Sequence, residues 1–330
     1  LFLNFSLMQL AQELKASIEA HLRRLAFDQR QPANLYAPMA YIMALKGKRI
    51  RPILTLLAYH SVSGQSPHSA LNLAASVELF HNFTLMHDDI MDRAPVRRGM
   101  PSVHVKWDEN IAILSGDALF AFSMGLVVKD FPEKAAPLAA EFSRASMEVC
   151  EGQMEDLDLA ERNEVAIEEY LEMIRKKTAA LLGSSLWLGA TAGGADQALA
   201  DRFRAFGEAL GIAFQLQDDL MDAFPPENFG KQVGGDIIEN KKTYLVLKAR
   251  DLAGTTQREA LEAWLAQTGE VPGKVDGVLD LFRQLDIEGH TRTLIQQYVS
   301  QAESLSEALA TSTDMGPLTA YLDQIARRKV

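Results

Sequence analysis

Apolar residues recur at intervals of three and four along almost the whole chain, and this periodicity constrains the fold more than any other feature of the sequence. Such spacing gathers apolar side chains on one face of an α-helix, whereas the alternation typical of β-strands is rare here. The sequence therefore predicts an all-α protein with about a dozen helices. We expect them near residues 8–30, 35–46, 49–63, 67–91, 103–128, 133–158, 164–192, 196–223, 237–252, 256–268, 274–286, 291–311 and 314–328.

A single domain is expected over residues 8–330, because no Pro-, Gly- or Ser-rich linker, low-complexity tract or internal repeat divides the helices. Residues 1–7 are apolar but too few, and without a basic flank, for a signal peptide. We expect them to be disordered or extraneous to the protein, with Met8 as its native start.

The composition argues against several classes of protein. The net charge is −11, and nucleic acid is bound by basic surfaces, so we expect no nucleic-acid partner. The apolar stretches are interrupted by His, Asp or Lys well short of the ~20 residues that span a bilayer, so no transmembrane segment is expected. Cys150, the single cysteine, cannot form an internal disulfide, which fits a cytoplasmic location.

Two predicted helices are apolar on nearly every face, which is typical of helices buried at the centre of a protein. They lie around residues 77–86 and 206–216, and each ends in a DDxxD motif, at 88–92 and 218–222. Charge at the edge of a core is unfavourable unless it is neutralised. Residues four apart share a helix face, and carboxylates without nearby His or Cys favour Mg²⁺. The two motifs therefore predict a magnesium site.

Basic residues are concentrated in short motifs, although the chain as a whole is acidic. The motifs are KGKRIRP at 46–52, RRG at 97–99, KKT at 176–178, and GK at 230–231 with KKT at 241–243. Arginine can hold two phosphate oxygens at once, and lysine supplies a compact charge. Arg97 begins its motif five residues after Asp92, so this pair must lie near the first DDxxD. We infer a small phosphate-bearing ligand.

In this order the motifs resemble those of the trans-isoprenyl diphosphate synthases, the family of farnesyl and geranylgeranyl diphosphate synthases. The resemblance covers nearly the whole chain and rests on KGKRIRP at 46–52, ELFHNFTLMHDDIMDRAPVRRGMPSVH at 78–104, KKT at 176–178, FQLQDDLMD at 214–222 and FGKQVGGDIIENKKTY at 229–244. Lys46 departs from the first Gly of the family's GGKR, and residues 225–228 depart before Gly230. The resemblance implies an orthogonal helical bundle around a central cavity, and a homodimer in which each subunit holds its own active site.

The resemblance also implies the roles of individual residues. Three Mg²⁺ ions per active site are expected on Asp88, Asp92 and Asp218, with Asp222 as a further ligand or support and Asp89 and Asp219 supporting them. The allylic diphosphate is expected on Arg97, Lys177, Lys231 and Lys241, and isopentenyl diphosphate on Lys48, Arg51, His81 and Arg98. The oxygens of Thr178 and Gln215 are expected to face a developing carbocation, which completes a catalytic set of Asp88, Asp89, Asp92, Lys177, Thr178, Gln215 and Asp218.

The expected reaction joins isopentenyl diphosphate head to tail with dimethylallyl, geranyl or farnesyl diphosphate. Magnesium and the cationic side chains would stabilise the departing diphosphate, and the released pyrophosphate would take the final proton. Apolar walls would keep water from the allylic cation, and loops 93–102 and 224–236 are candidate lids.

The product is expected to be C15–C20, with C20 slightly favoured. Phe83 precedes Asp88 by five residues, about 7.5 Å along a helix, and is placed to act as the floor of the pocket for the growing chain. Thr84 is small and leaves this pocket open, while Phe80, a turn further away, is a second candidate stop. The competing interpretation is that Phe83 is an ordinary core residue.

Three other functions fit parts of the sequence. A terpene cyclase also carries DDxxD, but it usually has an Asn/Ser/Glu-type second motif and needs no site for isopentenyl diphosphate. A non-catalytic modifier subunit of a prenyl synthase commonly lacks one aspartate motif, whereas both are intact here. Glu78 and His81 match the Glu-x-x-His spacing of di-iron bundles, but a second copy is missing.

Overall fold

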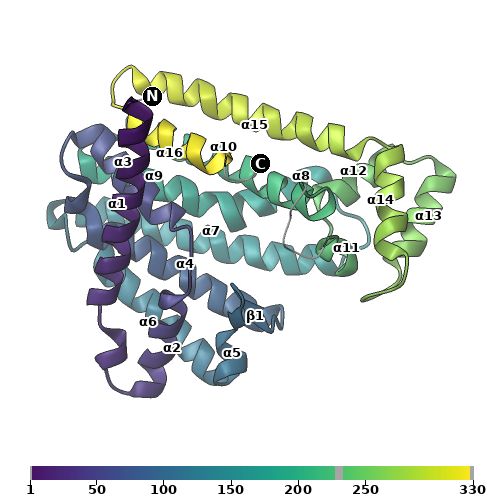
Figure 1. Ribbon diagram of the computed structural model, residues 1–330, viewed down its shortest axis with the longest axis horizontal. Coiled ribbons are helices and arrows are strands. Elements are labelled where there is room, and N and C mark those ends of the chain that lie inside the picture. Colours follow the sequence, from purple (N-terminus) through teal and green to yellow (C-terminus); the bar gives the residue numbers. More distant parts are fainter. Residues whose placement is uncertain (1, 227–232, 328–330) are drawn as a thin grey trace. The chain divides into compact units, whose positions relative to one another are not determined.

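The computed structural model describes residues 2–226 and 233–327, and most of them are helical (Figure 1). The α-helices are α1 (Phe2–Arg24), α2 (Ala33–Ala44), α3 (Ile50–Ser63), α4 (Leu71–Met91), α5 (Val103–Lys106), α6 (Glu109–Val127), α7 (Ala135–Glu161), α8 (Ile167–Ile174), α9 (Ala180–Gly193), α10 (Gln197–Ala223), α11 (Gly235–Ile238), α12 (Tyr244–Leu252), α13 (Thr255–Leu265), α14 (Lys274–Gln284), α15 (Ile287–Ala310) and α16 (Gly316–Arg327). The predicted all-α class is confirmed.

Short 3₁₀ helices η1 (Phe27–Gln29), η2 (Pro67–Ala70) and η3 (Pro132–Lys134) precede α2, α4 and α7, and the π-helix η4 (Arg175–Ala179) joins α8 to α9. The described chain divides into two compact units. Unit 1 takes in residues 2–144, 184–204 and 308–327, and unit 2 takes in 145–183, 205–226 and 233–307. Each unit is described by itself below.

Helix α4 is the central helix of unit 1. It packs against α6, α3, α2 and α1, and its residues Leu73, Val77 and Phe80 are fully buried. This environment explains why the sequence of α4 is apolar on nearly every face, because neighbouring helices bury most of residues 73–82. The prediction of a buried helix ending at the first DDxxD is confirmed.

Helix α6 differs from expectation, because by length and composition alone it is apolar enough to cross a membrane, with a mean hydropathy of 1.6. Its face toward α4 is that of a core helix, with Ala112 and Leu119 fully buried. Its other face is apolar as well, and Ile113 and Leu114 are 40% and 60% exposed. The high hydropathy of α6 therefore has two sources, a buried face and an uncovered one.

In unit 2, the motif-bearing part of α10 approaches the chain around α9 very closely. A Cβ added to Gly207 would lie 2.7 Å from Gly183 Cα, and one added to Gly211 would lie 2.5 Å from Ala179 Cα. Two glycines four residues apart thus allow backbone-to-backbone contact along one helix face. Next to them, Ile212, Leu216 and Tyr244 belong to a buried apolar cluster that fixes the end of α10.

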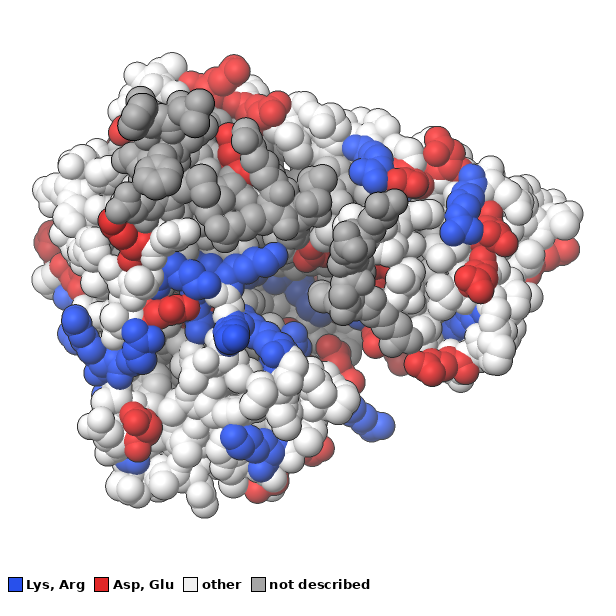
Figure 2. All heavy atoms as spheres, in the orientation of Figure 1, with Lys and Arg blue, Asp and Glu red and all other residues white. Residues whose placement is uncertain are grey.

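Within unit 2, basic and acidic side chains lie side by side over α12 to α14 (Figure 2). Arg250 Nε lies 2.8 Å from Glu262 Oε1, and Lys248 Nζ lies 2.8 Å from Asp251 Oδ2. Such mixed charge is typical of a solvated protein surface, where each pair contributes little to stability.

Several predicted boundaries need correction. The predicted helix 103–128 is broken, because Asp108 adopts an extended conformation and its side chain caps α6 by accepting from the amide of Ile111 at 2.8 Å. The predicted helix 237–252 is also broken, after Asn240, which has a φ of 56°. Residues 2–7 lie in α1 and are helical, while their expected extraneous origin stays a prediction.

Candidate active site

The first DDxxD motif closes α4. The amide of Asp92 donates to the carbonyl oxygen of Asp88 at 2.8 Å, so these two residues lie one helical turn apart, as the sequence predicted. Asp89 points into the protein and is 1% exposed, and the Arg97 guanidinium donates to its Oδ1 through Nε, at 2.9 Å, and through Nη2. Arg97, expected on the allylic diphosphate, thus holds the motif itself.

A short hairpin follows the motif where the sequence predicted a loop. Its strands are β1 (Val96–Arg97) and β2 (Met100–Pro101), and the turn residues Arg98 and Gly99 have φ values of 54° and 78°. Positive φ at both central positions is the geometry of a tight hairpin turn whose twist matches that of its strands. This turn places the Arg98 guanidinium against Gly47, where an added Cβ would lie 2.8 Å from Nη1.

Three of the residues expected to bind isopentenyl diphosphate lie together in unit 1. Nη1 of Arg51 lies 3.2 Å from Nε2 of His81. Arg98 lies against Gly47, which precedes Arg51 by four residues. Burial lowers the pKa of Arg51 to about 10, against the opposing effect of Glu78. Burial and then Arg51 hold the pKa of His81 well below its usual value, so the ring is neutral. Lys48 precedes them on an exposed part of the loop.

A buried ion pair beneath this cluster was not predicted from the sequence. Nη1 of Arg49 lies 2.5 Å from Oε1 of Glu78, and the two side chains are 3% and 2% exposed. Arg49 lies in KGKRIRP at 46–52 and Glu78 begins the motif at 78–104, but the sequence assigned neither residue a role in binding a diphosphate. The sequence did contain a hint of this pair. Glu78 lies in an apolar helix, where a buried carboxylate needs a cationic partner, and Arg49 is the third cation of KGKRIRP.

In unit 2, four side chains form a continuous hydrogen-bonded chain. Thr178 Oγ1 donates to Gln215 Oε1 at 3.0 Å, Gln215 Nε2 donates to Asp219 Oδ1 at 2.9 Å, and the Tyr170 hydroxyl donates to Asp219 Oδ2. Burial raises the pKa of Asp219 to about 7, although the hydrogen bonds from Tyr170 and Gln215 lower it. The structure thus brings Thr178 and Gln215 into direct contact and adds Tyr170, while the role of the two oxygens toward a carbocation stays a prediction.

Asp222, at the end of the second motif, caps α11. Its Oδ1 accepts from the amide of Gly235 at 3.2 Å and its Oδ2 accepts from the amide of Asp236 at 3.0 Å. Each oxygen keeps a second lone pair for a metal. Lys241 forms ion pairs with Asp236 at 3.1 Å and Glu239 at 3.0 Å. Lys231 lies outside the described residues.

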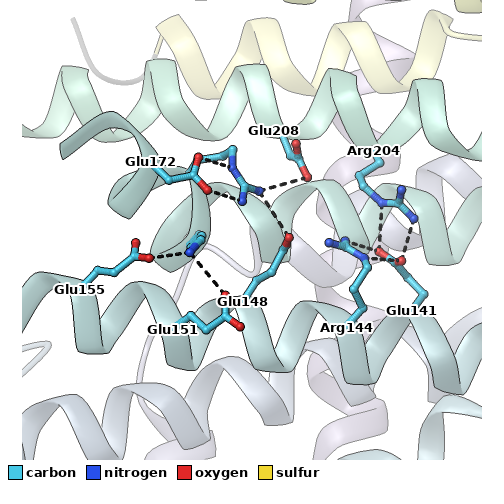
Figure 3. A network of polar contacts seen from close by, with 10 residues as sticks. Glu141, Arg144, Glu148, Glu151, Glu155, Glu172, Arg204 and Glu208 are labelled. Atoms are coloured by element: carbon cyan, nitrogen blue, oxygen red, sulfur yellow. Dashed lines mark hydrogen bonds and ion pairs between the residues drawn. The ribbon is translucent and has the colours of Figure 1, made fainter. Parts of the chain in front are cut away.

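The KKT motif at 176–178 lies in the π-helix η4, a distortion that is frequent at functional sites. The first two residues of η4 are cations that form ion pairs with glutamates. Arg175 pairs with Glu172, Glu148 and Glu208. Lys176 pairs with Glu155 and Glu151, and the glutamates of both networks are labelled in Figure 3. Lys177 instead pairs with Asp156 at 2.5 Å. A Cβ added to Gly152 of α7 would lie 2.3 Å from Lys177 N, so α7 fixes the backbone of Lys177 directly.

The predicted floor residues belong to an aromatic cluster in unit 1. The ring of Phe83 stacks on Phe120 with centroids 5.4 Å apart, and contacts Phe80 at 5.5 Å and His87 at 4.7 Å. Phe80 is fully buried, whereas Phe83 is partly exposed. The Thr84 hydroxyl donates back to the His81 carbonyl oxygen at 2.9 Å. Phe120, which the sequence did not single out, therefore belongs to the same aromatic cluster as Phe80 and Phe83.

The carboxylates are grouped by unit: the first motif belongs to unit 1 and the second to unit 2. Among the residues that the structure describes, no group of three or more His, Cys, Asp or Glu side chains converges to form a metal site by itself. Magnesium commonly uses one or two carboxylates and takes its other ligands from water and substrate phosphates, so such a group is not required.

Comparison with known proteins decides the family. Residues 32–282 match the family model described as polyprenyl synthetase. The chain belongs to the polyprenyl synthetase family. It is 41% identical over 249 residues to a geranylgeranyl diphosphate synthase of Methanosarcina mazei, a match that covers 74% of this chain and 76% of that one. It is 36% identical over 288 residues to a geranylfarnesyl diphosphate synthase of Natronomonas pharaonis, with 80% and 84% covered.

Solved structures of the polyprenyl synthetase family agree. A polyprenyl synthase from Caulobacter crescentus CB15, crystallised with calcium and isoprenyl diphosphate, has a TM-score of 0.80 and 30% sequence identity, with 92% of each chain covered. The polyprenyl synthetase described here is thus a prenyltransferase that makes short-chain trans-prenyl diphosphates, and the resemblance found in its motifs is confirmed.

Proposed function

We propose that this polyprenyl synthetase condenses isopentenyl diphosphate with an allylic diphosphate in a magnesium-dependent reaction that gives a C15–C20 product, with C20 slightly favoured. The observation that carries the proposal is the arrangement along α4. Its last turn presents Asp88 and Asp92, and about 10 Å earlier on the same helix His81 lies beside Arg51. One helix would thus carry both the carboxylate pair for the metal and a group that binds phosphate.

The phosphate-binding side chains would divide into one set for each substrate. Lys48, Arg51, His81 and Arg98 would hold the diphosphate of isopentenyl diphosphate, since the last three are brought together in unit 1. A neutral His81 ring can donate one hydrogen bond to phosphate without adding charge. Arg97, Lys177, Lys231 and Lys241 would hold the allylic diphosphate. In the described chain Lys177 and Lys241 already pair with acids, so substrate oxygens would replace those carboxylates.

The donor set fits magnesium. Asp88, Asp92 and Asp218 offer hard carboxylate oxygens, and Oδ2 of Asp89 is buried with no hydrogen-bond partner among the described residues. Asp222 would serve as a further ligand or support, alongside Asp89 and Asp219. We propose three ions per active site; when bound, they would neutralise the charge of the departing diphosphate.

The chain's own side chains govern the later steps of the reaction. Lysine and arginine side chains stabilise the negative charge on the leaving diphosphate, and the oxygens of Thr178 and Gln215 would face the allylic cation. Apolar residues of α4 and α10 exclude water, which would otherwise quench the cation. No side-chain base is needed, since the released pyrophosphate would take the proton. Phe83, supported by Phe80 and Phe120, would stop the growing chain.

A homodimer is proposed as the functional form, with one domain over residues 8–330 in each subunit. The matched family range, residues 32–282, includes segments of both units, which supports one domain. Helix α6 exposes Ile113 and Leu114, and α7 exposes Met147 and Met154 on one face. Apolar surface of this kind is commonly covered by a partner. The single cysteine is consistent with a cytoplasmic location.

The test is product analysis by mass spectrometry after incubation with isopentenyl diphosphate, Mg²⁺ and each allylic starter in turn. A C20 diphosphate as the main product supports the whole proposal, and a C15 product supports all of it except the chain-length preference. No product longer than the starter, with any of the three starters, would refute it. Light scattering of the same preparation checks the dimer, which Leu114→Glu should dissociate.

A further inference from the structure

Arg49 connects α4 with the end of α2 and the residue after it. Its Nη1 contacts Glu78 of α4, and its Nη2 donates to the carbonyl oxygens of Met43 at 2.7 Å and Leu45 at 3.0 Å. The residue has a φ of 55° and directly precedes α3. A left-handed backbone conformation is unfavourable for arginine, so the surrounding contacts must hold it there.

Glu78 is equally well fixed from its own helix. The Asn82 amide donates to Glu78 Oε1 at 3.1 Å and to the Glu78 carbonyl oxygen at 2.8 Å, and both residues are buried. The negative charge of Glu78 also acts on Arg51 and Arg98, since it raises the pKa of each against the effect of burial. One buried carboxylate therefore balances arginines from the start of α3 and from the β1–β2 hairpin.

The position of this pair suggests its role. Residues 43–49 carry Lys48 and lead directly into Arg51, and Gly47 in the same stretch lies against Arg98. We propose that Arg49 and Glu78 are positioning residues for the homoallylic substrate, which fasten the 43–49 segment to α4 and so fix Lys48, Arg51 and Arg98 around one diphosphate. This inference rests on the proposed function, because it names the ligand of that site.

Substitution of Glu78 distinguishes two effects that the pair could have on binding, namely positioning of the cations and a change in the local charge. Glu78→Gln keeps an oxygen for Arg49 and Asn82 but removes the negative charge, so the local potential becomes more positive. If charge alone mattered, the variant would bind isopentenyl diphosphate more tightly. If the pair positions the cations, the weakened contact to Arg49 should loosen the loop and binding should weaken.

The experiment is titration calorimetry with isopentenyl diphosphate in buffer containing EDTA, because the proposed cations need no metal. This measurement does not depend on turnover, so failure of the proposed reaction and failure of this inference are distinguishable. Glu78→Gln and Arg49→Met are expected to raise Kd by about tenfold or more, since losing one charge-assisted hydrogen bond to the diphosphate costs about that factor. In steady-state kinetics, KM for isopentenyl diphosphate should rise while KM for the allylic substrate stays nearly constant.

Glu141→Gln is the matched control. Glu141 is also a buried glutamate of unit 1, held by Arg144 at 2.8 Å and Arg204 at 2.7 Å (Figure 3), and neither arginine is a proposed substrate cation. It should lose stability with little change in Kd. Arg49→Lys, which keeps the charge, provides a second variant should Arg49→Met fail to fold. An unchanged or lowered Kd in folded Glu78→Gln, with an unchanged Kd in the Arg49 variant that folds, overturns the proposal.

Discussion

The hydroxyl of Tyr170 donates a hydrogen bond to Oδ2 of Asp219, and both side chains are buried. This contact ties α8 to the middle aspartate of the second motif, directly beside the proposed metal ligand Asp218. Tyr170→Phe should reduce kcat about tenfold or more and lower stability by roughly 1–3 kcal/mol, the usual cost of leaving a buried acceptor unpaired. Kinetics and thermal unfolding measure the two effects.

Tyr59→Phe provides the control for this prediction. Tyr59 is as buried as Tyr170, at 3% exposed, and its hydroxyl donates to Gln65 Oε1 at 2.9 Å in unit 1. It should lose stability without a comparable loss of kcat. Equal kinetic effects in the two variants would show that the Tyr170 contact has no special connection with catalysis.

Gly152→Ala should abolish most activity, because the new methyl group would meet Lys177 N at 2.3 Å and Lys176 Cβ at 2.8 Å. The π-helix must shift to accommodate it, and Lys177 and Thr178 move with that backbone. Gly125→Ala of α6 is the control, since its added Cβ meets nothing within 4 Å and should stabilise the helix by up to about 1 kcal/mol. Full activity in Gly152→Ala would contradict the proposed role of this backbone.

Both aspartate motifs should be required for turnover. Asp88→Ala and Asp218→Ala are each expected to lower kcat by several orders of magnitude with little effect on folding, because removing one of several neighbouring carboxylates relieves repulsion. EDTA should abolish the wild-type activity, and added Mg²⁺ should restore it. The exposed Asp251→Ala serves as control. Near-normal turnover in either motif variant would exclude a metal assembly that needs both motifs.

Product length should respond to the aromatic cluster. Phe83→Ala should shift the product to C25 and longer, because it removes the ring that stacks on Phe120, and Thr84→Phe should shorten it. Chromatography of the products at equal substrate ratios measures both shifts. Phe131→Ala, which removes a ring packed on Tyr59, is the control and should leave the distribution unchanged. If Phe83 is only a core residue, its truncation costs about 3–5 kcal/mol without altering the product.

His81 should make stability depend on pH. Its pKa is held well below the ordinary value of 6.5 in the folded chain, so below about pH 6.5 only the unfolded chain takes up the proton. Wild type should therefore lose stability relative to His81→Gln as the pH falls from 7 to 5, by up to about 1.4 kcal/mol per unit. Denaturant unfolding at each pH tests this, with the exposed His68→Gln as control. A constant difference between wild type and His81→Gln would contradict the prediction.

The sequence predicted those features that depend on local pattern. Periodicity located α4 and α10, and the motifs at their ends located the carboxylates, because both signals lie within one helix. The partners of these residues were missed. Asp156 beside Lys177, and Tyr170 beside Asp219, are distant in sequence and meet only through helix packing. The break at Asp108 could have been predicted, because an aspartate followed by a glutamate is a common helix start. The apolar periodicity on either side instead favoured one continuous helix.

Arg49 and Arg98 both have left-handed backbone conformations, with φ values of 55° and 54°. At position 98, glycine or asparagine would adopt this conformation with less strain, whereas at position 49 either residue would leave the buried Glu78 without its ion-pair partner. A laboratory search for more heat-resistant variants should therefore enrich Arg98→Gly or Arg98→Asn when it selects for folding alone, and should reject them when it selects for prenyl transfer. At the Arg98 turn, thermal stability and substrate binding are in direct conflict, which makes this position a poor target for stabilisation and a sensitive reporter of which property a population has been selected to keep.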